Sequence, residues 1–283
     1  MNKTILLTGA TDGIGLETAR MLATRGHTLL LHGRDAAKLA EVQAALSALP
    51  GAGRLETCLA DLSDLAEVEA LARAVQARHT RLDVLINNAG VLRAPETRTP
   101  HGLDLRFAVN TIAPYLLTQR LLPLLSAGRV INLSSAAQAP VDLDALAGHG
   151  RLDDMAAYAQ SKLALTMWSR HMALALEGRG PVVVAVNPSS MLGSKMVKEA
   201  FGVAGGDIRI GADILTRAAL ADEFATASGN YFDNDAKRFA PPHPDALDRG
   251  KTDALVRVIE SVLHAAKAGG AQPETTQEKG VRP

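Results

Sequence analysis

The sequence predicts an α/β fold in which helices cover both faces of a parallel sheet. Short apolar segments alternate with longer segments of helical pattern through most of the 283 residues, as expected for strands that are buried on both sides. Hydrophobic residues make up 47% of the chain, which is enough for a large core. A glycine-rich segment, Thr8 to Gly15, joins the first apolar segment to the first helical one. Together these observations favour a single domain with a doubly wound parallel sheet.

The composition argues against several classes of partner. The 30 basic residues balance the 30 acidic ones, so nothing favours nucleic acid or an anionic membrane. Cys58 is the only cysteine, which excludes an internal disulfide, and it has no neighbours with metal-ligand spacing, so no metal is expected. The first apolar segment is too short for a signal peptide, and no stretch is long enough to span a bilayer. We therefore expect a soluble, cytoplasmic protein with no membrane partner.

Seven strands are predicted, with helices between them. Gly26 follows the first helix, Asp35 and Asp64 are placed as helix N-caps, and Gly178 and Gly180 end the long helix that contains Tyr158. The predicted strands are Thr4 to Thr8, Thr28 to His32, Arg54 to Ala60, Val84 to Asn87, Arg129 to Leu133, Val182 to Val186 and a short one near Asn230 to Phe232. From Ala265 the chain is too polar to pack, so we expect a domain over residues 1–264 and a disordered tail over residues 265–283.

The glycine-rich segment is a candidate phosphate-binding loop. Gly9, Gly13 and Gly15 let the backbone turn sharply and approach a ligand closely, and the N–H groups at the start of the next helix favour an anion. The spacing, G-x-x-x-G-x-G, departs from the G-x-G-x-x-G dinucleotide fingerprint, and a glycine-rich turn without a ligand is the alternative. Its place directly after the first strand favours pyrophosphate binding.

The residues after the second strand bear on the choice of cofactor. An acidic side chain there would bind the adenosine ribose of NAD, whereas the 2′-phosphate of NADP requires a cation. The sequence is His32-Gly33-Arg34-Asp35, and Asp35 is explained as the N-cap of the helix that follows. Arg34 is then free to bind a phosphate, with a solvated arginine as the alternative. The sequence therefore favours NADP(H) over NAD(H).

Tyr158 and Lys162 form a candidate acid–base pair. Residues four apart lie on one face of a helix, so the hydroxyl and the ammonium can reach the same space. Lowering the pKa of a tyrosine from about 10 to about 7 requires roughly 4 kcal/mol, much of which one nearby cation in a shielded site can supply. Such a phenol moves a proton on or off a substrate oxygen. A packed tyrosine beside a solvated lysine is the alternative.

Asn110 lies in a helical segment, His101 to Leu125, that Pro114 interrupts. Pro114 has no N–H, so the carbonyl of Asn110, four residues earlier, loses its normal helical partner. That carbonyl must find another donor, which is either a functional group of the site or bulk water and neighbouring side chains.

These motifs, in this order, resemble those of the short-chain dehydrogenase/reductase family. The matching motifs are Thr8-Gly9-x-x-x-Gly13-x-Gly15, Asp61, Asn87-Asn88-Ala89-Gly90, Asn110, Asn132-Leu133-Ser134-Ser135 and Tyr158-x-x-x-Lys162, and they cover roughly residues 3 to 262. The stretch from Leu82 to Leu125 is similar to the retinol-dehydrogenase-like branch of the family. The resemblance implies a Rossmann-type fold and an oxidoreductase that uses a nicotinamide cofactor.

The resemblance also implies a role for each matching residue. The implied catalytic residues are Asn110, Ser135, Tyr158 and Lys162, with Ser135 on the substrate oxygen and the main chain of Asn110 on a water that connects Lys162 to solvent. The predicted cofactor-binding residues, Arg34 included, are Gly9, Gly13, Ile14, Gly15, Arg34, Asp61, Leu62, Asn88, Ala89, Gly90, Tyr158 and Lys162. Asp61 and Leu62 are placed beside adenine, Asn88 to Gly90 along the adenosine ribose, and Tyr158 and Lys162 on the nicotinamide ribose. The alternative for Ser134 and Ser135 is that both hydroxyls only satisfy the backbone.

The segment after the sixth strand departs from the family. The family has Pro-Gly there, with a threonine five positions after the proline. This chain has Pro188-Ser189, and its nearest hydroxyl is Ser194, one position late. The path beside the nicotinamide is therefore in question, and Ser189 and Ser194 are not counted among the site residues.

Two apolar segments are expected to line the substrate side of the cleft. They are the insert Ala136 to Ala157, with Val141, Leu143, Leu146, Leu152 and Met155, and a lid after Pro188, with Met191, Leu192, Met196, Val197 and Phe201. Core contacts are the alternative for each of these side chains. Such walls favour a small hydrophobic ketone, aldehyde or secondary alcohol as the substrate.

The sequence thus predicts an enzyme that interconverts a carbonyl and an alcohol by hydride transfer, with NADP(H) as the preferred cofactor and a small molecule as its partner. A non-catalytic NADP-binding regulator is one alternative, which Ser189 favours. A sugar epimerase or dehydratase is another, which the short region after the sixth strand argues against. The sequence leaves open whether the chain forms a homo-oligomer.

Overall fold

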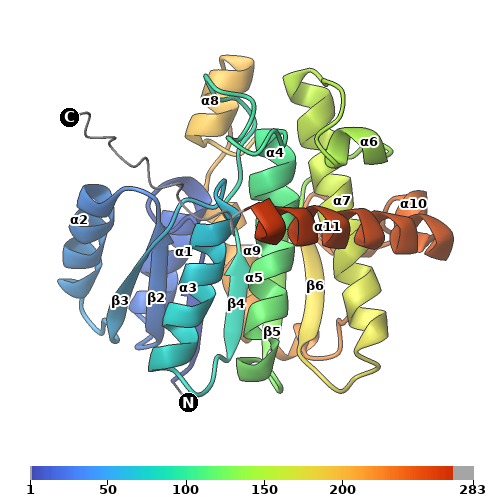
Figure 1. Ribbon diagram of the computed structural model, residues 1–283. Helices are drawn as coiled ribbons and strands as arrows, with labels where there is room; N and C mark the ends of the chain where they lie inside the picture. Colours follow the sequence, from blue (N-terminus) through green and yellow to red (C-terminus); the bar gives the residue numbers. More distant parts are fainter. Residues whose placement is uncertain (1, 270–283) are drawn as a thin grey trace, which may run out of the picture.

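The computed structural model describes residues 2–269, which form one eight-stranded sheet between two layers of helices (Figure 1). The strand order is β3-β2-β1-β4-β5-β6-β7-β8, and all neighbouring pairs are parallel except β7 and β8. The strands are β1 (Thr4–Leu7), β2 (Thr28–Gly33), β3 (Leu55–Leu59), β4 (Val84–Asn87), β5 (Arg129–Leu133), β6 (Val182–Asn187), β7 (Tyr231–Asp233) and β8 (Arg238–Ala240). The order reverses between β1 and β4, and ligands of such sheets bind outside the carboxyl ends of the strands at that point. The predicted doubly wound, Rossmann-type sheet is confirmed.

Helices cover both faces of the sheet because side chains alternate along its buried strands. Ile5 and Leu7 pack into one apolar core with α1, α2 and α9, whereas Leu6 packs into the other with α3, α5 and α7. The helices are α1 (Gly13–Ala23), α2 (Ala36–Ser47), α3 (Leu65–Arg78), α4 (Leu105–Phe107), α5 (Ala113–Leu121), α6 (Leu143–Leu146), α7 (Asp154–Ala175), α8 (Lys195–Phe201), α9 (Arg209–Leu220), α10 (Pro244–Leu247) and α11 (Arg249–Gly269). Short turns of other helix types are η1 (Ala108–Ile112, a π-helix), η2 (Leu122–Leu124) and η3 (Asp222–Phe224).

Helix α11 forms an outer layer across α5 and α7 (Figure 1). Near its end, Ala266 packs against the core and the Lys267 ammonium lies 3.4 Å from the Glu69 carboxylate on α3. The prediction of a disordered tail from Ala265 is therefore wrong for residues 265–269, which continue this helix. Alanine and lysine are strong helix formers, and one side of the helix still reaches the core. The remainder of the predicted tail, residues 270–283, lies outside the described residues.

The seven predicted strands are confirmed, with ends that differ by one residue at most. The predicted N-caps are confirmed as well: the Asp35 carboxylate accepts a hydrogen bond from the Lys38 N–H at 3.0 Å, and that of Asp64 accepts one from the Ala66 N–H at 2.8 Å. Strand β8 is an addition to the prediction. It has three residues and pairs only with β7, so it is too short to show a strand period in the sequence.

The helix predicted from His101 to Leu125 is shorter and irregular. It begins only at α4, where the Asp104 carboxylate accepts a hydrogen bond from the Arg106 N–H at 2.8 Å. The next turn is the π-helix η1, in which the Ala113 N–H reaches back five residues to the Ala108 carbonyl. Pro114 follows immediately, and a wide turn accommodates its missing N–H. This irregular turn carries Asn110.

Among residues 2–269, no helix combines the length and the apolar character needed to cross a bilayer. The same residues contain no group of three or more histidine, cysteine, aspartate or glutamate side chains placed to hold a metal ion.

Candidate active site

The glycine-rich loop lies at the switch point and is shaped for close approach of a ligand. Gly9 and Gly13 adopt φ angles of +66° and +55°, a region that favours glycine. A Cβ at Gly15 would lie 2.0 Å from the Gly9 carbonyl oxygen and 2.5 Å from Asn88 Nδ2, so no side chain fits there. The first N–H groups of α1, which include that of Ile14, have no acceptor within the helix. The loop therefore fits a dinucleotide phosphate.

Asn88 and Thr8 join the carboxyl ends of β1 and β4. Asn88 Nδ2 donates to the carbonyl oxygens of Thr8 at 2.9 Å and of Gly9 at 3.1 Å. The Thr8 hydroxyl accepts hydrogen bonds from the N–H groups of Asn88 at 3.0 Å and Ala89 at 3.1 Å. The predicted ribose-binding segment, Asn88 to Gly90, is thus fixed directly beside the predicted phosphate-binding loop.

His32 holds the glycine-rich loop against β2, a role that the sequence analysis missed. Its Nδ1 accepts a hydrogen bond from the Gly9 N–H at 3.1 Å, and its Nε2 lies 3.1 Å from the Ala60 carbonyl. Burial lowers the pKa of His32 to about 4, so the ring is neutral and donates through Nε2. The available signal was a histidine within an otherwise apolar strand.

Arg34 is exposed at the end of β2, next to the loop. A Cβ at Gly33 would lie 2.7 Å from Thr11 Cγ2, which shows how closely this strand end approaches the glycine-rich segment. Lys38, one turn later, pairs with the Asp12 carboxylate at 3.2 Å. Among residues 2–269, no carboxylate lies within ion-pair distance of Arg34, so its guanidinium is available to an anion.

The two residues predicted to contact adenine differ in their surroundings. The Asp61 carboxylate accepts a hydrogen bond from the Ser63 N–H at 2.9 Å at the end of β3. Leu62, in contrast, is 6% exposed and belongs to the core on the α3 side of the sheet. Only the main chain of Leu62 is therefore available to a ligand.

Tyr158 and Lys162 lie one turn apart on α7, at the carboxyl end of β5. The Lys162 ammonium is buried, donates to the Leu133 carbonyl at 2.7 Å and lies 5.7 Å from the centre of the Tyr158 ring. Burial lowers the pKa of Lys162 to about 8. Burial also raises the pKa of Tyr158, although a hydrogen bond with Ser135 opposes this. Burial therefore outweighs the effect of Ser135, and the phenol keeps its proton at neutral pH in this arrangement. That Lys162 lowers the pKa of Tyr158 stays a prediction.

Ser134 and Ser135 have different surroundings, although the sequence left open whether both are structural. The Ser134 hydroxyl lies 2.7 Å from the Thr166 hydroxyl and is buried among atoms of α7. The Ser135 hydroxyl accepts a hydrogen bond from the Ala137 N–H at 3.1 Å and lies near the Tyr158 hydroxyl, whose pKa it lowers. The second serine of the pair is thus the one placed beside the phenol.

Two side chains that the sequence analysis missed support Ser135 from behind. Gln138 Nε2 donates to the Ser135 carbonyl at 2.8 Å, and the Tyr231 hydroxyl donates to the same oxygen at 3.2 Å. Tyr231 comes from β7, 96 residues further along the chain. No local pattern in the sequence could place these residues together.

The side chain of Asn110 has only structural partners. Its Nδ2 donates to the Val91 carbonyl at 2.9 Å and to the Ser161 hydroxyl at 3.0 Å, while its Oδ1 accepts from the Val91 N–H at 2.8 Å. A Cβ at Gly90 would lie 3.4 Å from both Asn110 Oδ1 and Lys162 Nζ, so these groups meet around the glycine. Any role of Asn110 in a proton path is left to its main-chain carbonyl, as the sequence predicted.

The segment after β6 passes over the glycine-rich loop. Ser194 caps α8, where its hydroxyl accepts a hydrogen bond from the Val197 N–H at 3.2 Å. A Cβ added at Gly13 would lie 3.9 Å from the Cβ of Ser194. Leu192 is buried, whereas Met191 and Phe201 are 44% and 47% exposed. Leu192 is thus a core contact, and the other apolar side chains of the segment remain available as a lid.

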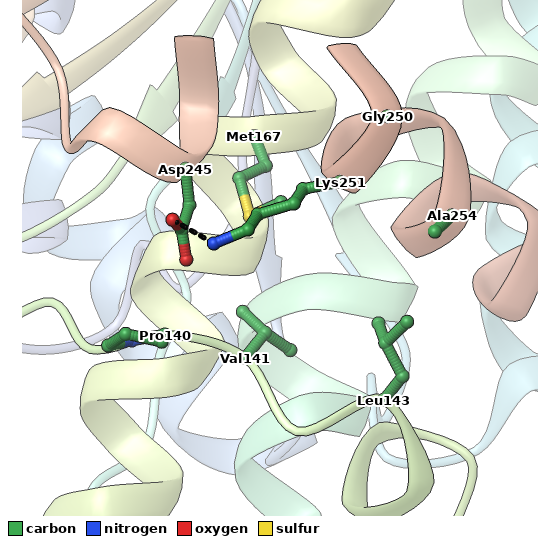
Figure 2. Close-up of a pocket in the computed structure, with 8 residues that line it drawn as sticks. All are labelled: Pro140, Val141, Leu143, Met167, Asp245, Gly250, Lys251 and Ala254. Carbon is green, nitrogen blue, oxygen red and sulfur yellow. Dashed lines mark hydrogen bonds and ion pairs between the residues drawn. The ribbon is translucent and has the colours of Figure 1, made fainter. Parts of the chain in front are cut away.

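Three apolar side chains of the insert before α7 do not line the catalytic cleft as expected. Leu146 is fully buried in the core, and Val141 and Leu143 line a different cavity of about 280 Å³ between α7, α10 and α11 (Figure 2). Met167 forms the α7 side of that cavity, and nine residues separate it from Tyr158, which places the two on opposite faces of the helix. An ion pair of 2.6 Å between Asp245 and Lys251 crosses its wall (Figure 2). The expectation is therefore wrong for these three side chains, Leu152 packs partly buried against the core, and a role for Met155, which is 39% exposed, stays a prediction.

Comparisons with known proteins agree with this geometry. A sequence model described as short chain dehydrogenase matches residues 3–202. Retinol dehydrogenase 13 of Homo sapiens is 34% identical over 276 residues, which cover 87% of this chain and 80% of that protein. Polyprenol dehydrogenase of Mus musculus is 33% identical over 290 residues, covering 95% and 85%. Among solved structures, the NADP complex of Pseudomonas aeruginosa RhlG is 28% identical with a TM-score of 0.66, covering 82% of this chain and 94% of that one. The landomycin C-6 ketoreductase LanV, with bound NADP and rabelomycin, is 32% identical with a TM-score of 0.64, again covering 82% and 94%.

Proposed function

The chain belongs to the short chain dehydrogenase family, and from this premise we propose that it is an NADP(H)-dependent oxidoreductase that interconverts a carbonyl and an alcohol. The observation that carries the proposal is the meeting of Ser135, Tyr158 and Lys162 beside a loop shaped for a dinucleotide phosphate. The retinol and polyprenol dehydrogenases among its relatives act on CH–OH groups, as their names state, which supports this class of reaction.

The side chains of the site supply proton transfer and positioning. The nicotinamide cofactor, when bound, gives or takes the hydride. The Tyr158 hydroxyl keeps its proton at neutral pH and so acts as the donor to a carbonyl oxygen, while Ser135 binds the same oxygen. Lys162 supports the phenolate that remains and, through the main chain of Asn110, connects it to solvent. Residues that would hold the cofactor are Gly9, Gly13, Ile14, Gly15, Arg34, Asp61, Leu62 through its main chain, Asn88, Ala89, Gly90, Tyr158 and Lys162.

The test of this function is a survey of carbonyl compounds with the purified protein. NADPH is mixed with ketones and aldehydes, and the absorbance of the reduced cofactor is followed; the reverse direction uses NADP and secondary alcohols. We expect turnover with several apolar compounds. A protein that binds NADPH and turns over none of them would be a cofactor-binding regulator instead.

We predict that Arg34 gives the preference for NADPH over NADH. Charge-assisted hydrogen bonds contribute roughly 1.5 to 3 kcal/mol, so Arg34→Ala should reduce the preference by about tenfold to a hundredfold. The measurement is the dissociation constant of each cofactor for both proteins. Arg54→Ala is the matched control, because Arg54 precedes β3 at the opposite end of the sheet and pairs with Glu56 at 3.0 Å. Equal affinities for the two cofactors in the wild-type protein would refute the assignment.

We also predict that activity rises with the apolar size of the substrate. The apolar side chains that remain available over the cleft are Met155, Met191, Met196, Val197 and Phe201, which carry no charge. Each buried CH₂ contributes about 0.8 kcal/mol, so kcat/KM should rise about fourfold per methylene until the cleft is full. A series of straight-chain methyl ketones measures this. A flat response, or activity confined to carboxylated or phosphorylated compounds, would indicate that Lys195 or Lys198 binds the substrate instead.

A further inference from the structure

The turn after β6 adopts a backbone conformation that is normally left to glycine. Ser189 has a φ angle of +111° and Met191 one of +53°, and both carry a Cβ. Such angles are unfavourable for L-residues, and they persist only where the surroundings hold them. At the position of Ser189 the family pattern has a glycine. This chain must therefore hold the turn by other means.

Asp235 supplies the contacts that hold this turn. Its Oδ1 accepts hydrogen bonds from the Ser189 hydroxyl at 2.5 Å and from the Ser190 N–H at 2.9 Å. Its Oδ2 accepts from the Ser190 hydroxyl at 2.6 Å and from Asn187 Nδ2 at 3.0 Å. Burial opposes ionisation of Asp235, but these four hydrogen bonds outweigh it and lower the pKa of the carboxyl to about 2. Asp235 is thus ionised at any working pH of the protein.

When Asp235 holds the turn in this conformation, the turn directs the segment that follows it over the predicted cofactor site. Leu192 Cδ1 lies 2.7 Å from the position of a Cβ on Gly211, so Leu192 occupies space that only a glycine on α9 leaves open. Further on, α8 lies beyond the carboxyl ends of the strands, where Arg93 donates to the Glu199 carbonyl at 3.0 Å (Figure 1). The segment therefore spans the cleft from β6 to the loop after β4.

The hairpin formed by β7 and β8, which carries Asp235, also supports Ser135. Tyr231 at the start of β7 donates to the Ser135 carbonyl at 3.2 Å, and Asp235 follows four residues later in the turn towards β8. Asn234 Nδ2, between them, donates to the Pro188 carbonyl at 2.9 Å. One short element thus fixes both the Ser135 side of the cleft and the turn that leads over the cofactor.

We propose that Asp235 is a positioning residue, which holds the Pro188 to Met191 turn in the conformation that a glycine would otherwise provide, and thereby places the segment after β6 over the nicotinamide cofactor. This proposal rests on the proposed function, because it names the cofactor as what the segment covers. It predicts that the need for Asp235 depends on the residue at position 189.

The experiment compares Asp235→Ala, Ser189→Gly and the double variant with the wild-type protein. Displacement of a binding element by about 1 Å can reduce function by up to a hundredfold, so Asp235→Ala should raise both the dissociation constant and the KM for NADPH by about tenfold or more. Because glycine adopts positive φ without strain, the double variant should return to within about threefold of Ser189→Gly. Limited proteolysis of residues 188–206 should accelerate in Asp235→Ala and slow again in the double variant.

Asp245→Asn is the matched control, since it removes an aspartate that pairs with Lys251 at the separate cavity of Figure 2. If Asp235→Ala does not fold, Asp235→Asn with and without Ser189→Gly replaces it, with a smaller loss and the same recovery expected. A loss of thermal stability with unchanged NADPH affinity, or a loss that Ser189→Gly does not recover, would overturn the proposal. Because the dissociation constants need no turnover, a wild-type protein that reduces no carbonyl would refute the proposed function and leave this comparison intact.

Discussion

Tyr158→Phe should reduce turnover by about 10²- to 10⁴-fold while leaving the dissociation constant for NADPH nearly unchanged. The variant lacks only the hydroxyl that delivers the proton, and the ring that packs beneath Lys162 remains. Loss of a transition-state contact lowers kcat and kcat/KM together, whereas loss of a binding contact would raise KM. The measurement is a full kinetic comparison on the best substrate of the carbonyl survey, with cofactor binding determined separately.

Tyr115→Phe is the matched control for this change. The Tyr115 hydroxyl donates to Glu260 at 3.0 Å on the outer side of α5, away from the cleft, so its loss should leave turnover unchanged. Retained activity in Tyr158→Phe on every accepted substrate would show that Tyr158 is not the proton donor. In that case the chain would bind the cofactor for another purpose, as the regulator alternative states.

Local patterns predicted the parts of the site that lie close together in the sequence. Tyr158 and Lys162 are one helical turn apart, and the glycine-rich loop is continuous, so spacing alone was informative for both. His32, Tyr231 and Asp235 act on residues 23 to 96 positions away. These contacts depend on which strands β2 and β7 pair with in the sheet, and no short-range sequence pattern predicts that pairing.

Errors in the prediction have the same origin. Val141 and Leu143 are apolar and follow Ser135, but they reach the opposite side of α7 and meet α11 instead of the cleft. The sequence pattern gives an apolar face without naming its partner. The polar composition after residue 264 likewise concealed one more turn of α11, whose partner on α3 is distant in the sequence. A cytoplasmic location stays a prediction.

Lys162 provides a test that links function to stability, because its charge is buried. Burial lowers its pKa in the folded protein from an ordinary 10.5 to about 8. Below pH 8 both the folded and the unfolded chain carry this proton, and the folded state bears the full unfavourable effect of the buried charge. Between pH 8 and 10.5 only the unfolded chain carries it, so stability rises with pH over this window. At 1.36 kcal/mol per pKa unit, a shift of 10.5 − 8 = 2.5 corresponds to about 3 kcal/mol.

The free energy of unfolding of the wild-type protein should therefore rise by about 3 kcal/mol between pH 7.5 and 10.5, and Lys162→Met should lack this rise. The turnover of Lys162→Met should be lower by about 10²-fold or more. Urea unfolding of both cofactor-free proteins across this pH range measures the difference. Lys251→Met is the control, because the Asp245 side chain raises the pKa of Lys251 above 10.5, so both the folded and the unfolded chain carry that proton over this range and the difference from the wild-type protein should stay nearly constant with pH. A difference that stays constant with pH would mean that the buried ammonium has an ordinary pKa. The predicted pH dependence would show that the fold retains a destabilising charge on a residue of the proposed catalytic site.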